Sequence, residues 1–247
     1  MNLAICGLGY VGSVTAVCMA RAGHTVIGVD ISEKKTRMIR EGIPPVIEEG
    51  LAPLLREVVL EGRLTATTDL NMALQQADIT LVAVGTPSRP NGSLDTTALE
   101  RICEDLGRGL RSNPRPHTLV IRSTVLPGTC RNLLIPIIQE FANRTLDDNL
   151  GLVYNPEFMR EGSSVKDFYS PPFTILGRDN EHHGSVAASL YASISAPLER
   201  VAQRRGAPAL PDDGARHRAA GASLPEEGGF ALIGHADGGE PTRRRAG

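Results

Sequence analysis

The sequence lacks the features that mark membrane, secreted and nucleic-acid-binding proteins. No stretch of its 247 residues approaches the roughly 18 uninterrupted apolar residues of a membrane-spanning helix. Its start has neither the basic region nor the small-residue cleavage site of a signal peptide, so we expect a cytoplasmic protein. The net charge is −2, without the clustered positive charge that binds nucleic acids or anionic membranes. We therefore expect neither of these partners and favour small-molecule chemistry.

Signatures of metal sites and disulfide frameworks are missing as well. The four cysteines form no C-x-x-C pair, and the six histidines show no metal-ligand spacing. We expect no metal site and four reduced thiols. These thiols are Cys6, Cys18, Cys103 and Cys130.

Lysine is scarce, because Lys34, Lys35 and Lys166 are the only lysines among 26 basic residues. Such an arginine excess is typical of GC-rich coding. Residues 202–247 are more biased still, since Ala, Gly, Arg and Pro make up 30 of these 46 residues. This composition cannot bury enough apolar surface to offset the entropy of ordering, so we expect a disordered tail. We hypothesise that the tail is translated out of frame and that the chain is a truncated gene product; reading the other two frames beyond codon 201 tests this.

Apolar runs alternate with helical patterns along residues 1–201. Strands are expected at residues 3–6, 25–29, 79–84 and 118–121, and helices at 11–20, 96–110 and 129–142. This alternation is typical of βαβ units and predicts an α/β fold with a Rossmann-like, doubly wound parallel sheet. Further strands at 152–154 and 173–176 and a helix from about 181 to 194 are expected to extend or flank the sheet.

The motif GLGYVG at residues 7–12 follows the first expected strand and opens the first helix. Gly7 permits a tight turn, Gly9 lets the backbone approach a pyrophosphate, and Gly12 allows the helix to pack closely on the strand. The free N–H groups of the helix start favour phosphate. Asp30, at the end of the second strand, can accept hydrogen bonds from ribose hydroxyls and would repel a 2′-phosphate. The sequence therefore predicts a dinucleotide site that prefers NAD to NADP, although a plain glycine turn would also account for the three glycines.

Two later segments lie where parallel sheets bind ligands, beyond the carboxyl ends of strands. In VGTPS at residues 84–88, Thr86 offers a hydroxyl, although a plain strand-to-loop turn would look the same. In RSTVLPGT at residues 122–129, Thr124 is placed to reach a nicotinamide or a substrate. Helix capping alone would account for Ser123 and Thr129.

The segment NPEFMREG at residues 155–162 carries two carboxylates four residues apart, Glu157 and Glu161. They would share one face if this turn is helical, and paired carboxylates suit acid/base work or the binding of sugar hydroxyls. From the residues alone, a solvated acidic surface is the stronger interpretation.

Taken together, the four segments at residues 7–12, 84–88, 122–129 and 155–162 resemble the UDP-glucose/GDP-mannose dehydrogenase family, over about residues 1–201. The resemblance implies NAD-dependent oxidation of the C6 hydroxyl of a nucleotide sugar to a carboxylate. In the family a cysteine holds the aldehyde as a thiohemiacetal and then as a thioester, which water releases. The segments VGTPSRPNGSLD and IRSTVLPGT are more similar to members that oxidise GDP-mannose, for alginate polysaccharide, than to those acting on UDP-glucose.

The resemblance also implies roles for single residues. Glu157 matches the glutamate associated with thioester hydrolysis, Glu161 a carboxylate that contacts substrate, and Thr124 a catalytic residue. The implied cofactor contacts are Gly7, Gly9, Tyr10, Val11, Gly12, Asp30, Lys35, Thr86 and Thr124.

The resemblance stops after residue 201. The family continues with a helical domain, through which it largely dimerises and which supplies a lysine, an asparagine and the nucleophilic cysteine, and then with a second Rossmann-like domain. None of these signatures occurs in residues 202–247, so we expect no family-type dimer and poor solubility. The resemblance implies a nucleotide-sugar 6-dehydrogenase, and GDP-mannose is the expected substrate rather than UDP-glucose. For this chain itself, we favour a non-catalytic NAD-binding fragment. A hydroxyacid dehydrogenase would need a catalytic lysine or histidine in a later helical domain.

Overall fold

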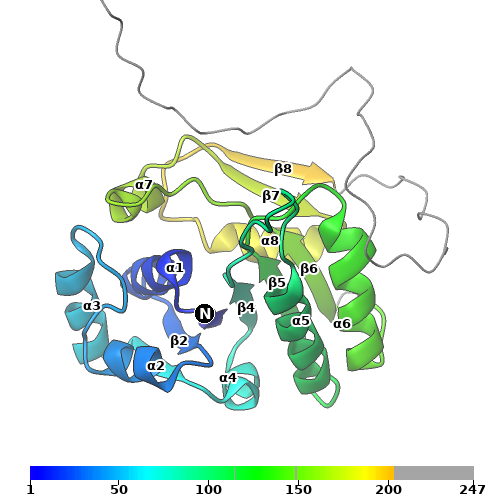
Figure 1. Ribbon diagram of the computed structural model, residues 1–247, viewed down its shortest axis with the longest axis horizontal. Helices are drawn as coiled ribbons and strands as arrows, with labels where there is room; N and C mark the ends of the chain where they lie inside the picture. The colour runs from blue at the N-terminus through cyan, green and yellow to red at the C-terminus, as the bar shows by residue number, and fades with distance from the viewer. Residues whose placement is uncertain (114, 148, 203–247) are drawn as a thin grey trace, which may run out of the picture. The chain divides into compact units, whose positions relative to one another are not determined.

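An eight-stranded sheet runs through the residues that this computed structural model describes, 1–113, 115–147 and 149–202 (Figure 1). The strand order is β3-β2-β1-β4-β5-β6-β7-β8. The strands are β1 (Asn2–Cys6), β2 (Thr25–Val29), β3 (Leu64–Thr67), β4 (Ile79–Val82), β5 (His117–Ile121), β6 (Leu150–Tyr154), β7 (Thr174–Arg178) and β8 (Leu198–Ala202). The expected Rossmann-like α/β fold is confirmed. The expected tail lies outside the described residues, apart from Ala202.

Neighbouring strands from β3 to β6 pair in parallel, as expected for βαβ units. The strand expected at 173–176 is β7, which pairs antiparallel to β6, and β8 then pairs parallel to β7. The link from β6 to β7 contains a short helix, α7 (Ser164–Tyr169), and brings the chain back in the opposite direction along the sheet.

Helices cover both faces of the sheet (Figure 1). One apolar cluster joins the sheet to α1 (Tyr10–Arg21), α2 (Glu33–Arg40), α3 (Leu51–Leu60), α7 and α8 (Glu181–Ser189). The other joins it to α4 (Leu70–Gln76), α5 (Thr97–Leu110), the π-helix η1 (Cys130–Leu134) and α6 (Ile135–Ala142). No helix among the described residues is both long and apolar enough to cross a bilayer.

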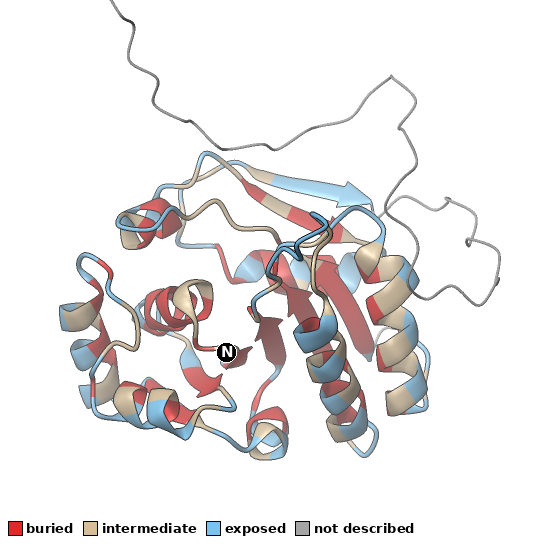
Figure 2. Ribbon diagram, viewed as in Figure 1, coloured by how far each residue is buried: buried red, intermediate tan, exposed pale blue. Residues whose placement is uncertain are grey.

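Alternation along β1 explains how one strand serves both layers. Leu3 and Ile5 belong to the first cluster, whereas Ala4 and Cys6 belong to the second. Successive side chains of a strand point to opposite faces, so a strand covered on both sides must be apolar throughout. Figure 2 accordingly shows the central strands as buried. This double burial fixes the strand that leads into the glycine motif.

Two expected helices have different limits in the structure. The helix expected at 129–142 begins as the π-helix η1 and becomes the α-helix α6 at Ile135. Pro136 cannot donate to the carbonyl four residues earlier, which disfavours a regular α-helical turn there. The helix expected to reach residue 194 ends at Ser189, after which Leu190 and Tyr191 donate to carbonyls three residues back and tighten the turn.

The connections after β1 and β4 place ligand-binding loops at one edge of the sheet. β1 lies between β2 and β4, so the chain moves from β1 to one side and returns from β3 to the other. Parallel strands end at a common edge, and ligands of doubly wound sheets bind where the strand order reverses. The segments after β1, β4, β5 and β6 therefore meet at this carboxyl edge.

Candidate functional site

The glycine motif forms a tight turn between β1 and α1. Gly7 has φ +94°, a conformation that side chains disfavour, and its N–H donates to the Val29 carbonyl over 2.8 Å. A Cβ on Gly12 would lie 1.7 Å from the Gly7 carbonyl oxygen, so no side chain fits there. A Cβ on Gly9 would meet nothing within 4 Å, which leaves the backbone at the start of α1 open to approach. The loop thus fits a pyrophosphate against the helix N-terminus.

Asp30 stands beside this loop at the end of β2, with 8% of its side chain exposed. Its Oδ2 accepts from the Leu8 N–H over 2.7 Å, and its Oδ1 accepts from the Ser32 N–H over 2.9 Å. Lys35 Nζ also donates to Oδ2, over 3.2 Å. An ionised carboxylate offers about four lone-pair sites, so an acceptor position is left for a ribose hydroxyl. Sequence reasoning assigned Asp30 to the ligand alone, whereas the structure also makes it the anchor of the glycine loop.

The loops after β4 and β5 are joined to one another. The Thr86 hydroxyl donates to the Thr124 carbonyl over 2.7 Å, and the Ser123 hydroxyl donates to the Val84 carbonyl over 2.6 Å. Ser123 therefore ties two loops together and does not cap a helix. Thr129 precedes η1 and makes no side-chain capping bond. The structure thus brings Thr86 and Thr124 together at the carboxyl edge, and Thr124 is exposed there.

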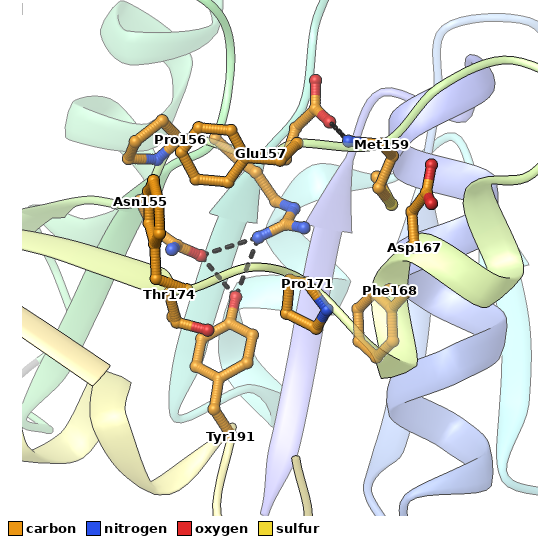
Figure 3. Close-up of a pocket in the computed structure, with 12 residues that line it drawn as sticks. Asn155, Pro156, Glu157, Met159, Asp167, Phe168, Pro171, Thr174 and Tyr191 are labelled. Carbon is orange, nitrogen blue, oxygen red and sulfur yellow. Dashed lines mark hydrogen bonds between the residues drawn. The ribbon is translucent and has the colours of Figure 1, made fainter. Parts of the chain in front are cut away.

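The NPEFMREG segment is a loop, so the helical turn considered for it is wrong. Glu157 is half-buried, its Oε2 accepts from the Met159 N–H over 2.6 Å, and it lines a pocket (Figure 3). Glu161 is exposed and does not line that pocket. The two carboxylates lie on one loop but do not share a helical face.

A buried polar cluster lines the same pocket. Arg122 Nη1 donates to Asn155 Oδ1 over 2.7 Å and to the Tyr191 hydroxyl oxygen over 2.9 Å, and the Tyr191 hydroxyl donates to Asn155 Oδ1 (Figure 3). Asn155 Nδ2 donates to the Ile175 carbonyl on β7 over 2.9 Å. The cluster joins the ends of β5 and β6 to β7. Sequence reasoning missed Tyr191, for which the local sequence carries no signal.

Burial makes the four cysteines unreactive. All four lie within the described residues, are buried, and form no disulfide. Burial raises the pKa of each of these thiols to about 12. For Cys130 this outweighs any lowering by the nearby helix start, so no thiolate is available near neutral pH. Among the described residues, no group of three or more His, Cys, Asp or Glu side chains is placed to hold a metal ion.

Comparison with known proteins agrees with this geometry. Residues 1–195 match the NAD-binding domain of the UDP-glucose/GDP-mannose dehydrogenase family. GDP-mannose 6-dehydrogenase of Azotobacter vinelandii is 44% identical over 200 residues, which are 81% of this chain and 46% of that protein. A UDP-glucose 6-dehydrogenase of Haloferax volcanii is 38% identical over 194 residues, or 78% of this chain and 45% of that protein.

A solved structure has a similar fold. The ternary complex of GDP-mannose dehydrogenase from Pseudomonas aeruginosa superposes with a TM-score of 0.80 at 40% identity, covering 82% of this chain and 46% of that one. The chain thus spans about half the length of the curated relatives it matches. With the glycine loop, its Asp30 anchor and the matching family model, the chain belongs to the UDP-glucose/GDP-mannose dehydrogenase family and carries that family's NAD-binding domain.

Proposed function

We propose that this chain supplies the cofactor-binding half of an NAD-dependent nucleotide-sugar 6-dehydrogenase whose substrate is GDP-mannose. The observation that carries the proposal is the bond from the Leu8 N–H to Asp30, because it holds the phosphate-binding loop and the ribose-binding carboxylate as one unit. The choice of GDP-mannose is supported by the higher identity to GDP-mannose 6-dehydrogenases than to the UDP-glucose enzymes.

The exposed groups of the carboxyl edge receive roles under this proposal. The backbone at Tyr10 and Val11, with Lys35 and the joined threonines Thr86 and Thr124, holds the dinucleotide; NAD, when bound, accepts the hydride. Thr124 also contacts the reacting part of the sugar. Glu157, on the pocket wall, exchanges protons with water or substrate, and Glu161 contacts the sugar from the same loop.

The buried thiols favour a second candidate, a chain that binds NAD without turning over the sugar. The family reaction runs through a cysteine, and none of the four cysteines offers a thiolate or an exposed sulfur. In this candidate the described residues bind the cofactor, and oxidation through a thioester requires a residue that they do not contain.

Titration of the purified chain with NADH, followed by cofactor fluorescence, tests the binding step. We expect saturable binding that is weaker for NADPH, because the Asp30 carboxylate repels a 2′-phosphate. The variant Asp30→Asn should bind NADH about tenfold more weakly, since a hydrogen bond to a charged group is lost. Asp105→Asn, on the exposed face of α5, is the matched control and should bind like the wild type. Equal affinity of the wild type for NADH and NADPH would contradict the assigned role of Asp30.

A spectrophotometric assay separates the two candidates. GDP-mannose-dependent formation of NADH by the purified chain, at a higher rate than with UDP-glucose, would support the dehydrogenase and rule out the non-catalytic candidate. Binding of NADH without any sugar-dependent NADH formation would show that this chain binds the cofactor but does not oxidise the sugar by itself, as the non-catalytic candidate requires.

A further inference from the structure

Glu48, in the loop between α2 and α3, reaches across to the segment that carries Glu161. Its Oε2 accepts from the Gly162 N–H over 3.0 Å, and its Oε1 accepts from the Ser164 N–H over 2.9 Å. The donors are 114 and 116 residues away in the sequence, and Glu48 is only 9% exposed. Ser163, which precedes α7, makes no side-chain capping bond, so Glu48 satisfies the free Ser164 N–H at that helix start. One carboxylate thus fixes the backbone directly after Glu161.

The glycine loop reaches the same point through Tyr10, the first residue of α1. The Tyr10 hydroxyl and the Ser164 hydroxyl are both buried, and neither has a hydrogen-bond partner in the described part of the chain. The pKa of Tyr10 is raised by burial and by the charges of Glu48 and Glu161, whereas the adjacent Ser164 hydroxyl acts in the opposite sense. Helix α1, which begins at Tyr10, also contacts helix α7, which begins at Ser164.

We propose that Glu48 is a positioning residue that links the order of the cofactor loop to the order of the segment at residues 157–164. This inference rests on the proposed function, in which the glycine loop binds NAD and Glu161 contacts the sugar. Ordering of the glycine loop by a bound pyrophosphate fixes Tyr10 at the start of α1, and α1 contacts α7, whose first N–H is held by Glu48. Two hydrogen bonds to one carboxylate are strong enough to restrain the backbone at Gly162 and Ser164 when the glycine loop becomes ordered. A carboxylate that only capped α7 would hold the segment equally with and without cofactor.

Hydrogen exchange with and without NADH, measured on the full chain by mass spectrometry, distinguishes the two roles. The variant Glu48→Gln keeps one acceptor oxygen and presents an NH₂ group to the other N–H, so exchange in segment 157–164 should become about tenfold faster. Glu49→Gln changes the adjacent, exposed glutamate and is the matched control. In the wild type and in Glu49→Gln, NADH should slow exchange both at residues 7–12 and at residues 157–164. In Glu48→Gln it should slow exchange at residues 7–12 only.

Each other outcome overturns the inference in a recognisable way. If NADH still protects residues 157–164 in Glu48→Gln, or protects only residues 7–12 in the wild type, the link through Glu48 does not exist although the cofactor binds. If NADH protects neither region of the wild type, the proposed function fails and this inference fails with it. Should circular dichroism show Glu48→Gln to be unfolded, Glu48→Asp replaces it, because the shorter side chain keeps the charge but cannot reach both N–H groups. The outcomes given above for Glu48→Gln then apply to Glu48→Asp.

Discussion

Acid should destabilise this domain through one buried histidine, His117 at the start of β5. Its side chain is buried, its Nε2 lies 2.8 Å from the Thr80 hydroxyl oxygen, and its Nδ1 has no partner in the described residues. Burial, and then the charge of Arg115, lower the pKa of His117 from 6.5 to about 4. The folded chain therefore keeps this imidazole neutral, while the unfolded chain binds a proton below about pH 6.5.

The sign and size of the effect follow from that difference in pKa. Because the unfolded state binds more protons between pH 6.5 and pH 4, stability falls as the pH is lowered through this range and changes no further below it. The full difference in the pKa of His117 corresponds to about 3 kcal/mol in the free energy of unfolding. About 2 kcal/mol of this stability should be lost between pH 7 and pH 5. The loss is large for a domain whose unfolding free energy is of the order of 5–15 kcal/mol.

Urea unfolding at pH 7 and pH 5 measures this loss against a variant that cannot titrate. His117→Gln removes the ionisable group, so the wild type should lose about 2 kcal/mol more than the variant between the two pH values. His182→Gln, on the exposed surface of α8, is the control and should show the wild-type dependence. Equal losses in the wild type and His117→Gln would refute the reasoning, whatever the other acidic groups contribute to both.

Three further outcomes are expected. Gly12→Ala should abolish NADH binding and lower the melting temperature, because its Cβ would lie 1.7 Å from the Gly7 carbonyl oxygen; a variant with wild-type affinity would contradict the close packing. The four thiols should react with a thiol-specific reagent only in denaturant, so rapid labelling of the native chain would show that they are not buried as described. Thr86→Val should weaken NADH binding while Thr97→Val does not, since only Thr86 ties the β4 loop to Thr124; equal affinities would show that this tie is not needed.

Sequence patterns predicted the parts of the fold that have a strong local signal. β1, β2, β4 and β5 are buried apolar runs, and the glycine motif marks the turn into α1. The pattern failed where burial is partial or absent. Only two residues of β3 are buried and none of β8 is, so neither strand forms an apolar run. Strand direction is not encoded locally either, which is why the sequence predicted a strand at 173–176 but not its antiparallel pairing with β6.

The candidate site shows the same division. Asp30 could be assigned from its place after β2, because dinucleotide sites need an acceptor at that spacing. Its second task, holding the Leu8 N–H, depends on a contact between residues 22 positions apart. Glu48 lies more than a hundred positions from the two amides that donate hydrogen bonds to it. The segment around it follows no periodic apolar pattern or glycine motif. Only the folded backbone brings such partners together.

The double use of Asp30 limits how the cofactor preference of this domain can evolve or be engineered. A change towards NADP requires removal of the negative charge beside the 2′ position. A substitution that also removes the acceptor frees the Leu8 amide and loosens the turn on which either dinucleotide depends. A successful switch must therefore replace Asp30 with a neutral side chain that still accepts that bond, such as Asn or Ser, and supply a cation for the phosphate elsewhere. In this domain, one side chain contributes both to selectivity for the ribose and to the shape of the phosphate loop.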